Sequence, residues 1–266
     1  MIPAISGRPR IAAVLVAVAV ACVPSAWLQA QAPKRLTIAA ASDLQTVLPG
    51  IVRDFERSAS ASLVVSYGSS GSFFAQIQNG APFDVFLSAD VDYPKQLAAA
   101  GVADASTLHV YATGHLVLWA RRDTKLDLSR GLASLSDSRV RRIAVANPRF
   151  APYGRAAAAA LRSARLYDVL QPKLVTGDSL AQAAQLVESG NADVGLLSRS
   201  LVLGPALKAA GTYVDIPPSA HPPIDQAAIV VKASREPALA RAFITFLGGG
   251  EAGRHLERFG FALPRR

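Results

Sequence analysis

The sequence predicts an α/β fold in which mixed sheets are covered by helices on both faces. Apolar stretches with a period of two residues alternate along the chain with stretches whose apolar residues recur every three to four positions. The 266 residues also suffice for one to two domains with a sizeable core. Strict alternation of strand and helix favours parallel or mixed sheets between helical layers.

The first part of the fold is expected to begin with a strand over residues 34–40. A helix is expected over residues 44–58, where five apolar side chains share one face. Two more pairs of strand and helix follow, the last helix ending at Gly101. These strands are expected at residues 63–67 and 84–87, and these helices at residues 73–78 and 93–100.

The alternation continues beyond Gly114, with strands expected at 116–120, 142–146 and 193–197 and helices at 153–163 and 180–189. A third block has an expected strand at 224–231 and a closing helix at 237–247. The proline-rich residues 216–223 are expected to form an extended connection. Together with residues 111–114, this connection would make a two-stranded hinge between two lobes.

Residues 1–32 are expected to be a secretory signal peptide and not part of the fold. Arg8 and Arg10 precede an apolar run over residues 11–23, and small residues follow. The run is too short to span a bilayer as a mature helix. We therefore expect an exported protein.

The site of signal cleavage has two candidates, after Ala30 and after Ala32. Either cut removes Cys22, the only cysteine, and so excludes disulfides and a cysteine nucleophile in the mature chain. Lipid anchoring at Cys22 is the weaker alternative, because alanine stands at position 19 where a lipoprotein box usually has leucine.

The formal net charge of +9 is scattered along the chain. Its few arginine clusters carry no interleaved aromatic residues of the kind that stack on bases. We therefore expect no nucleic-acid partner and interpret most of the charge as solvated surface.

Four expected helix starts carry features that suit an anion. Ser42 and Ser179 are each followed three residues later by glutamine, as in a capping box, and Ser70 stands between glycine-containing turns. Pro152 suits a first helical position, which leaves the Tyr153 amide free to donate. Each feature alone is typical of an ordinary helix cap. Several of them at the carboxyl ends of strands indicate a ligand site, because open α/β sheets bind ligands there.

Five strings spread over the chain carry a family resemblance. They are AAASDL (39–44), YGSSGSFFAQI (67–77), GAPFDVFLSAD (80–90), NPRFAPYGR (147–155) and LVESGNADVG (186–195), followed by the closing FGF (259–261). In this order they resemble the periplasmic molybdate-binding proteins of molybdate ABC transporters. The resemblance covers essentially the whole mature chain.

The resemblance implies a type II periplasmic binding protein whose two lobes grip a tetrahedral oxyanion. Lobe one would comprise residues 33–112 and 220–266, and lobe two residues 113–219. The protein would act in the periplasm as a monomer without a cofactor or a metal other than that of its ligand. It would deliver molybdate, and tungstate, to an ABC transporter permease in the inner membrane.

The resemblance also implies which residues hold the oxyanion. Ser42 and Ser70 would donate through side chain and backbone, and Tyr153 and Leu180 through the backbone. Where the family pattern has a tyrosine hydroxyl in lobe two, this chain has Ser198, so either Ser198 or the Tyr153 hydroxyl is expected to take that place.

Asp43 complicates this expected site, because a carboxylate repels an anion. We expect its side chain to face away or to cap the helix, with only its amide near the ligand.

Three alternatives to molybdate binding remain at this point. The same architecture serves carriers of sulfate, thiosulfate, phosphate or ferric iron, and periplasmic sensor modules. A serine hydrolase is less favoured, because position 72 is a serine where the Gly-x-Ser-x-Gly motif has glycine. The four histidines also show no spacing typical of a metal site.

Overall fold

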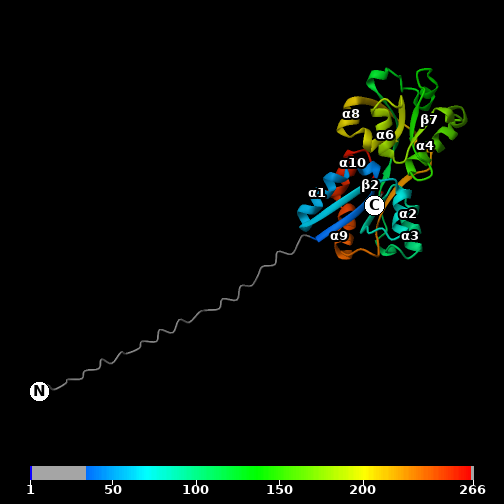
Figure 1. The fold of residues 1–266 in the computed structure, drawn as a ribbon. Coiled ribbons are helices and arrows are strands. Elements are labelled where there is room, and N and C mark those ends of the chain that lie inside the picture. The colour runs from blue at the N-terminus through cyan, green and yellow to red at the C-terminus, as the bar shows by residue number, and fades with distance from the viewer. Residues whose placement is uncertain (2–33, 265–266) are drawn as a thin grey trace. The chain divides into compact units, whose positions relative to one another are not determined.

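Two five-stranded mixed sheets form the framework of the chain, and each is covered by helices (Figure 1). The computed structural model describes Met1 and residues 34–264. Apart from Met1, the predicted signal peptide, with both cleavage sites and Cys22, lies outside the described residues. Among the described helices, none is both long and apolar enough to cross a membrane.

The first sheet has the strand order β2-β1-β3-β10-β4. Strand β1 is parallel to β2 and β3, whereas β10 runs antiparallel to β3 and β4. The strands are β1 (Lys34–Ala41), β2 (Ala61–Gly68), β3 (Val85–Ser88), β4 (His109–Gly114) and β10 (Ile224–Val230). We call this sheet and its helices lobe one.

Helices cover both faces of the first sheet, as the alternation of its side chains requires. Leu36, Ile38 and Leu87 pack into one core, and Ala39 and Phe86 into the core on the opposite face. Figure 1 shows α1, α9 and α10 on one side of this sheet and α2 and α3 on the other. The helices are α1 (Leu48–Ala59), α2 (Ser70–Gln78), α3 (Asp92–Ala99), α9 (Pro237–Leu247) and α10 (Gly250–Arg258).

The second sheet repeats the arrangement of the first, with the order β7-β6-β8-β5-β9. Strand β6 is parallel to β7 and β8, and β5 runs antiparallel to β8 and β9. The strands are β5 (Leu116–Arg121), β6 (Ile143–Ala146), β7 (Leu174–Gly177), β8 (Val194–Ser198) and β9 (Gly211–Asp215). We call this sheet and its helices lobe two.

Lobe two has a single continuous core around the fully buried Trp119 and the alanine-rich face of α4. Its helices are α4 (Pro152–Ser163), α5 (Tyr167–Leu170), α6 (Leu180–Glu188), α7 (Arg199–Val202) and α8 (Pro205–Ala210). Short 3-10 helices complete the described chain: η1 (Ser42–Leu44), η2 (Ala105–Thr107), η3 (Arg122–Thr124), η4 (Gly131–Ser136), η5 (Gln171–Lys173) and η6 (Pro218–Ala220).

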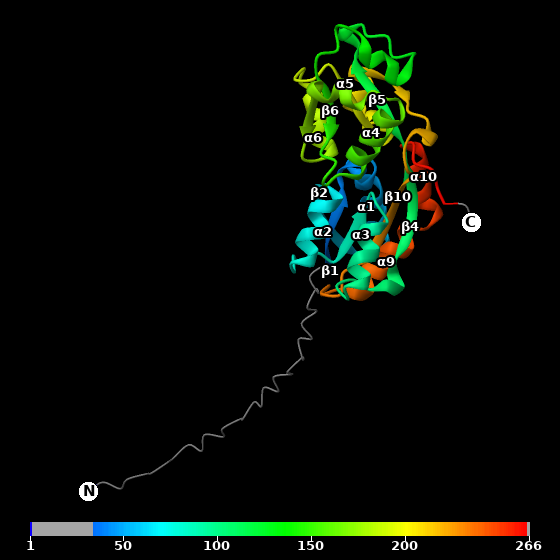
Figure 2. The same cartoon turned by 90° about the vertical axis from the view of Figure 1, so that its right-hand side faces the viewer.

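The chain crosses between the lobes at two neighbouring places. Strand β4 of lobe one leads through His115 into β5 of lobe two (Figure 2). The return runs from β9 to β10, where the Ile216 amide donates to the Leu116 carbonyl (3.0 Å) and Ile224 pairs with Gly114. The return is not extended throughout, because residues 218–220 turn as η6. The exact lobe limits remain a prediction.

The alternating mixed α/β architecture is confirmed, but two helix starts differ from the prediction. Ser42 does not cap a long helix, because residues 42–44 form η1 and α1 begins only at Leu48. Helix α2 begins at Ser70 and not at Phe73, so Ser70 lies inside its first turn. Ser42 directly follows β1, and Ser70 lies two residues after the end of β2.

Candidate functional site

An inner cavity lies where helix starts of the two lobes meet. Its lining includes Ser42, Asp43, Ser70, Tyr153 and Leu180. Five of the six residues named from the sequence are therefore brought together, although they span 138 positions from Ser42 to Leu180. The volume of the cavity is about 10 Å³, which suffices for roughly one water molecule.

Lobe one contributes to the cavity the residues that follow β1 and β2. Ser42 is the first residue of η1, and Ser70 is the first residue of α2. The Ser70 hydroxyl accepts a hydrogen bond from the Ala89 amide (3.0 Å), which leaves its own proton free to donate into the cavity. First-turn N–H groups have no partner within a helix, so the start of α2 adds backbone donors.

Lobe two contributes the residues that follow β6 and β7. Pro152 takes the first position of α4, as predicted, and Tyr153 the second. Leu180 is the first residue of α6, whose N-cap Ser179 accepts from the Gln182 amide (3.3 Å). Only half of the predicted capping box forms there. The Gln182 side chain accepts from the Asp178 amide (2.7 Å) and not from the Ser179 amide, as a capping box requires.

The inner cavity offers an anion no positively charged side chain among the described residues. Within the described part of the chain, the residues that line it include no lysine, arginine or histidine. The described residues also hold no cluster of His, Cys, Asp or Glu suited to a metal ion. Hydroxyls, amides and the positive ends of helix dipoles are therefore the groups available to an anion.

Asp43 lines the inner cavity, and its buried carboxylate lies against the side chains of Gln226 and Tyr153. It is 1% exposed, and its Oδ2 accepts a hydrogen bond from the Gln226 side-chain amide. The Tyr111 hydroxyl donates to Gln226 Oε1 (2.8 Å), which turns the amide nitrogen of Gln226 toward Asp43. Burial raises the pKa of Asp43 to about 6, although hydrogen bonding from Gln226 and then from Tyr153 lowers it in part.

The Tyr153 hydroxyl reaches the same place from lobe two. It lies so close to Gly114 that a Cβ there would stand 2.0 Å from its oxygen. Burial, followed by the charge of Asp43, raises the pKa of Tyr153 well above its usual value. Among the described residues, neither the Tyr153 hydroxyl nor Asp43 Oδ1 has a hydrogen-bond partner of good geometry.

Ser198 lies outside the lining of the inner cavity. It is the N-cap of α7, where its hydroxyl accepts from the Leu201 amide (3.3 Å) and lies 3.0 Å from the Ser200 hydroxyl. Both serines are buried. Of the two residues considered from the sequence for this hydroxyl, Tyr153 is the one that lines the cavity.

An ion pair that no sequence pattern predicts joins the lobes outside the cavity. Arg155 on α4 pairs with Asp90, which follows β3, and donates to the Tyr93 hydroxyl (3.1 Å). Its guanidinium also lies 5.4 Å from the centre of the Tyr93 ring. These groups border an outer cavity that shares Ala89 and Pro152 with the inner one. Partners 65 positions apart leave no local pattern to find.

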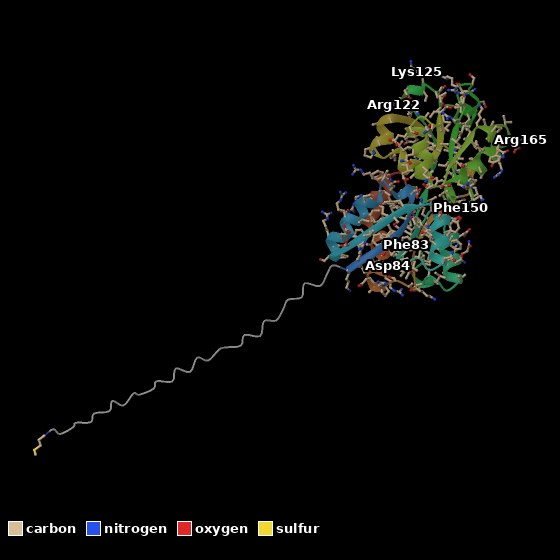
Figure 3. The ribbon with its side chains drawn as sticks, in the orientation of Figure 1. Phe83, Asp84, Arg122, Lys125, Phe150 and Arg165 are labelled. Carbon is tan, nitrogen blue, oxygen red and sulfur yellow. The ribbon has the colours of Figure 1, made fainter. Side chains whose placement is uncertain are left out.

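Three direct hydrogen bonds also connect the lobes close to the site. The Gly71 amide donates to the Phe150 carbonyl (2.8 Å), and Phe150 lies where the lobes meet (Figure 3). On another side, Thr46 donates to the Ser200 carbonyl (2.9 Å), and the Ser200 hydroxyl donates to the Asp43 carbonyl (2.7 Å). The basic residues Arg122 and Lys125 lie at the far end of lobe two, away from this junction (Figure 3).

Comparisons with known proteins match this architecture to one family. Residues 36–262 match the family described as bacterial extracellular solute-binding protein. The chain is 38% identical over 196 residues to the molybdate-binding protein ModA of Rhodobacter capsulatus, which covers 74% of this chain and 75% of the relative. The solved periplasmic molybdate-binding protein of Azotobacter vinelandii is 34% identical, with a TM-score of 0.81 over 86% of this chain and 100% of that one.

A more distant structure shares the fold alone. The sulfate-binding protein SubI from Mycobacterium tuberculosis H37Rv has a TM-score of 0.71 at 16% identity, over 86% of each chain. Its likeness carries no information about the ligand of this chain.

Proposed function

The chain belongs to the bacterial extracellular solute-binding proteins, and we propose that it captures molybdate, and tungstate, for an ABC transporter. The matches to relatives named molybdate-binding protein extend over three quarters or more of the length of each relative. The resemblance drawn from the sequence strings is thereby confirmed.

One observation carries the proposal: helix starts from both lobes converge on a cavity, and none of the described residues that line it has a cationic side chain. A hydrogen bond to a charged group contributes roughly 1.5–3 kcal/mol, and each helix end adds about 0.3–1 kcal/mol or more when partly buried. Several such donors acting together suffice to hold a small dianion. We assign the contacts to Ser42, Ser70, Tyr153 and Leu180.

The donors in this proposal contact the oxygens of the anion and not its metal centre. A fully deprotonated oxyanion presents only acceptors, and so it matches a site made of donors. Hydrogen phosphate would place its O–H against another donor. Sulfate also presents only acceptors, and its discrimination therefore depends on the size of the closed cavity.

A hydrolytic function finds little support in the site. The Ser70 hydroxyl accepts from a backbone amide, and within the described residues no histidine lines the inner cavity to act as its base. The relatives are binding proteins.

The wider role follows from the family. We propose that residues 1–32 direct export to the periplasm, that the protein acts there as a monomer without a cofactor, and that closure of the lobes around the anion presents it to the permease. Loss of molybdate uptake at low molybdate concentration in a deletion strain, restored by the intact gene, tests this role.

Ligand-dependent thermal unfolding tests the binding itself. An anion at one hundred times its dissociation constant stabilises the folded state by about 2.7 kcal/mol. We expect molybdate and tungstate to raise the melting temperature, and sulfate and phosphate at equal concentration to leave it unchanged. A rise with sulfate or phosphate alone, or turnover of ester substrates, would contradict the proposal.

A further inference from the structure

We propose that Ser200 of lobe two is a positioning residue of the site, which holds the closed lobes together through hydrogen bonds to Asp43 and Thr46 of lobe one. We call this pair of hydrogen bonds the Ser200 bridge. The inference rests on the proposed function, since it needs an anion around which the lobes close. Ser200 would not touch the anion but would set how long the closed form retains it.

The Ser200 bridge uses both the side chain and the backbone of one residue of α7. The Ser200 hydroxyl donates to the Asp43 carbonyl (2.7 Å), and the Ser200 carbonyl accepts from the Thr46 hydroxyl (2.9 Å). The two partners lie three positions apart on the segment that begins with η1. Two bonds from one residue to this segment fix its orientation as well as its distance from lobe two.

The lobe-one end of the bridge lies in the wall of the inner cavity. Ser42 and Asp43 both line this cavity. The carbonyls of Ser42 and Leu44 accept from amides of lobe one, whereas the Asp43 carbonyl accepts from Ser200 of lobe two. Because Asp43 is buried, its carbonyl needs a partner, and lobe two supplies one. The bridge therefore fixes the residue that directly follows the proposed ligand donor Ser42.

The lobe-two end of the bridge is oriented by a second serine. The Ser200 hydroxyl gives its only proton to Asp43, so the 3.0 Å contact between the two serine hydroxyls requires Ser198 to donate. The Ser198 hydroxyl accepts in turn from the Leu201 amide (3.3 Å). Ser198 and Ser200 are both buried. Lobe two thus holds the Ser200 hydroxyl ready for its partner, which reduces the entropy lost when the bridge forms.

The lobes pack closely beside the bridge. A Cβ at Gly204 of lobe two would stand 2.6 Å from Thr46 Cγ2 of lobe one. A cavity of about 370 Å³ borders this place, and Thr46, Leu201 and Gly204 are among its lining residues. Separation of the lobes here would break both bonds and let water reach the groups that made them.

The bridge should therefore act after the anion has entered. The anion binds to separated lobes, and the bridge forms only when they close. Its loss should leave the rate of association unchanged and raise the rate of dissociation, as is usual for changes within one interface. A hydrogen bond that persisted in the open form would change neither rate.

The variant Ser200→Ala tests the bridge. A chase of bound radioactive molybdate with excess unlabelled molybdate measures the dissociation rate, and calorimetry measures the dissociation constant. We expect both to rise by the same factor of at least about two, the effect of one net hydrogen bond. Their ratio, the association rate constant, should stay unchanged. A rise of the dissociation rate by less than twofold overturns the inference.

Thermal unfolding of the free protein separates positioning from a structural role. Ser200→Ala should melt at the temperature of the control Ser58→Ala, whose hydroxyl bonds the Phe55 carbonyl within lobe one (2.8 Å). The control should also release molybdate at the rate of the unmodified protein. Ser198→Ala removes the N-cap of α7 and should lower the melting temperature. A Ser200→Ala protein that melts as low as Ser198→Ala would make Ser200 a structural residue of lobe two and overturn the inference.

The variant Thr46→Val tests the bridge from lobe one and decides the question if Ser200→Ala fails to fold. Valine keeps the branched shape of threonine and removes the donor to the Ser200 carbonyl. We expect faster release of molybdate with an unchanged melting temperature of the free protein, and an unchanged release rate contradicts the bridge. Unmodified protein that binds no molybdate would instead refute the proposed function.

Discussion

Two carboxylates at the junction of the lobes have opposite surroundings: Asp43 at the inner cavity, which we call the floor, and Asp90 at the outer cavity, which we call the rim. At the floor, Asp43 lies just after β1, is 1% exposed and accepts a hydrogen bond from the neutral amide of Gln226, with the neutral Tyr153 hydroxyl beside it. At the rim, Asp90 follows β3, its side chain is 24% exposed and it pairs with Arg155 of the other lobe. The same residue type is thus kept apart from positive charge in one place and paired with it in the other.

The difference indicates that separate groups connect the lobes and bind the ligand. The ion pair at the rim connects the lobes, and the neutral donors at the floor are available to the ligand. A fixed guanidinium at the floor would attract any anion, whereas neutral donors select one by geometry and by protonation. At the rim, water screens the charges, so an ion pair there adds little affinity and instead fixes the position of the lobes. The predictions below test this division between floor and rim.

The largest effect is expected on stability from Asp43→Asn in the absence of ligand. The pKa of the folded carboxyl is raised from 3.8 to about 6, so the unfolded chain ionises first as the pH rises. Stability therefore falls between about pH 4 and pH 6, by roughly 3 kcal/mol in total. Asparagine escapes this loss, so the variant should gain stability relative to the unmodified protein at pH 8 and much less at pH 4.

Urea unfolding at both pH values measures that gain. Asp92→Asn, an exposed carboxylate of the same lobe, should show no comparable difference. Equal stability changes for Asp43→Asn at pH 4 and pH 8 would mean that Asp43 does not titrate as a buried acid.

The next effect is expected from Ser70→Ala at the floor. It removes the hydroxyl that we propose as a donor to the ligand, and it leaves the Ala89 amide without its acceptor. Affinity for molybdate should fall by at least ~1.5 kcal/mol, or more than tenfold. Calorimetry measures this, with Ser72→Ala as the control, because Ser72 bonds the Ser69 hydroxyl and does not line the inner cavity. An unchanged affinity would remove Ser70 from the site.

A similar or smaller loss is expected from Gly71→Ala, which acts on closure. A Cβ at this position would stand 2.7 Å from the Phe150 carbonyl of the other lobe and 2.8 Å from the Tyr93 hydroxyl. Overpacking of this kind costs about 1–3 kcal/mol, and we expect it to appear as weaker binding with little change in the melting temperature of the free protein.

The matched control for Gly71→Ala is Gly250→Ala, because a Cβ at position 250 meets nothing within 4 Å. A Gly71→Ala protein that binds molybdate as tightly as this control would show that the lobes do not need to approach so closely.

The smallest effect is expected at the rim. Arg155→Ala should weaken binding by no more than about 1 kcal/mol, because the ion pair is partly exposed. We expect the change mainly in the dissociation rate, measured by stopped-flow fluorescence. Arg149→Ala, an exposed arginine near the same junction, should have no effect. A collapse of affinity in Arg155→Ala would mean that the site depends on a salt bridge after all.

The sequence predicted those features that depend on local pattern. Alternating apolar residues located strands such as Lys34–Ala41, and Pro152 marked the start of α4. Ser42 and Ser70 stood at the carboxyl ends of strands, where such folds bind ligands. These features depend on neighbours along the chain, and local sequence therefore reveals them.

Contacts between distant parts of the chain were not predictable in this way. The Asp43 carboxylate accepts a hydrogen bond from Gln226, which lies 183 positions later, and no local pattern near Asp43 predicts that partner. Ser198 caps helix α7 in its own lobe and does not line the cavity. The local signal predicted which residues start the helices but not which side chains the closed lobes bring together.

Parallel calorimetric titrations with molybdate, tungstate, sulfate and phosphate test the central claim most directly. The account predicts tight binding of one molybdate or one tungstate per chain and no measurable binding of sulfate or phosphate. Sulfate or phosphate bound as tightly as molybdate, or no heat with any of the four anions, would contradict it.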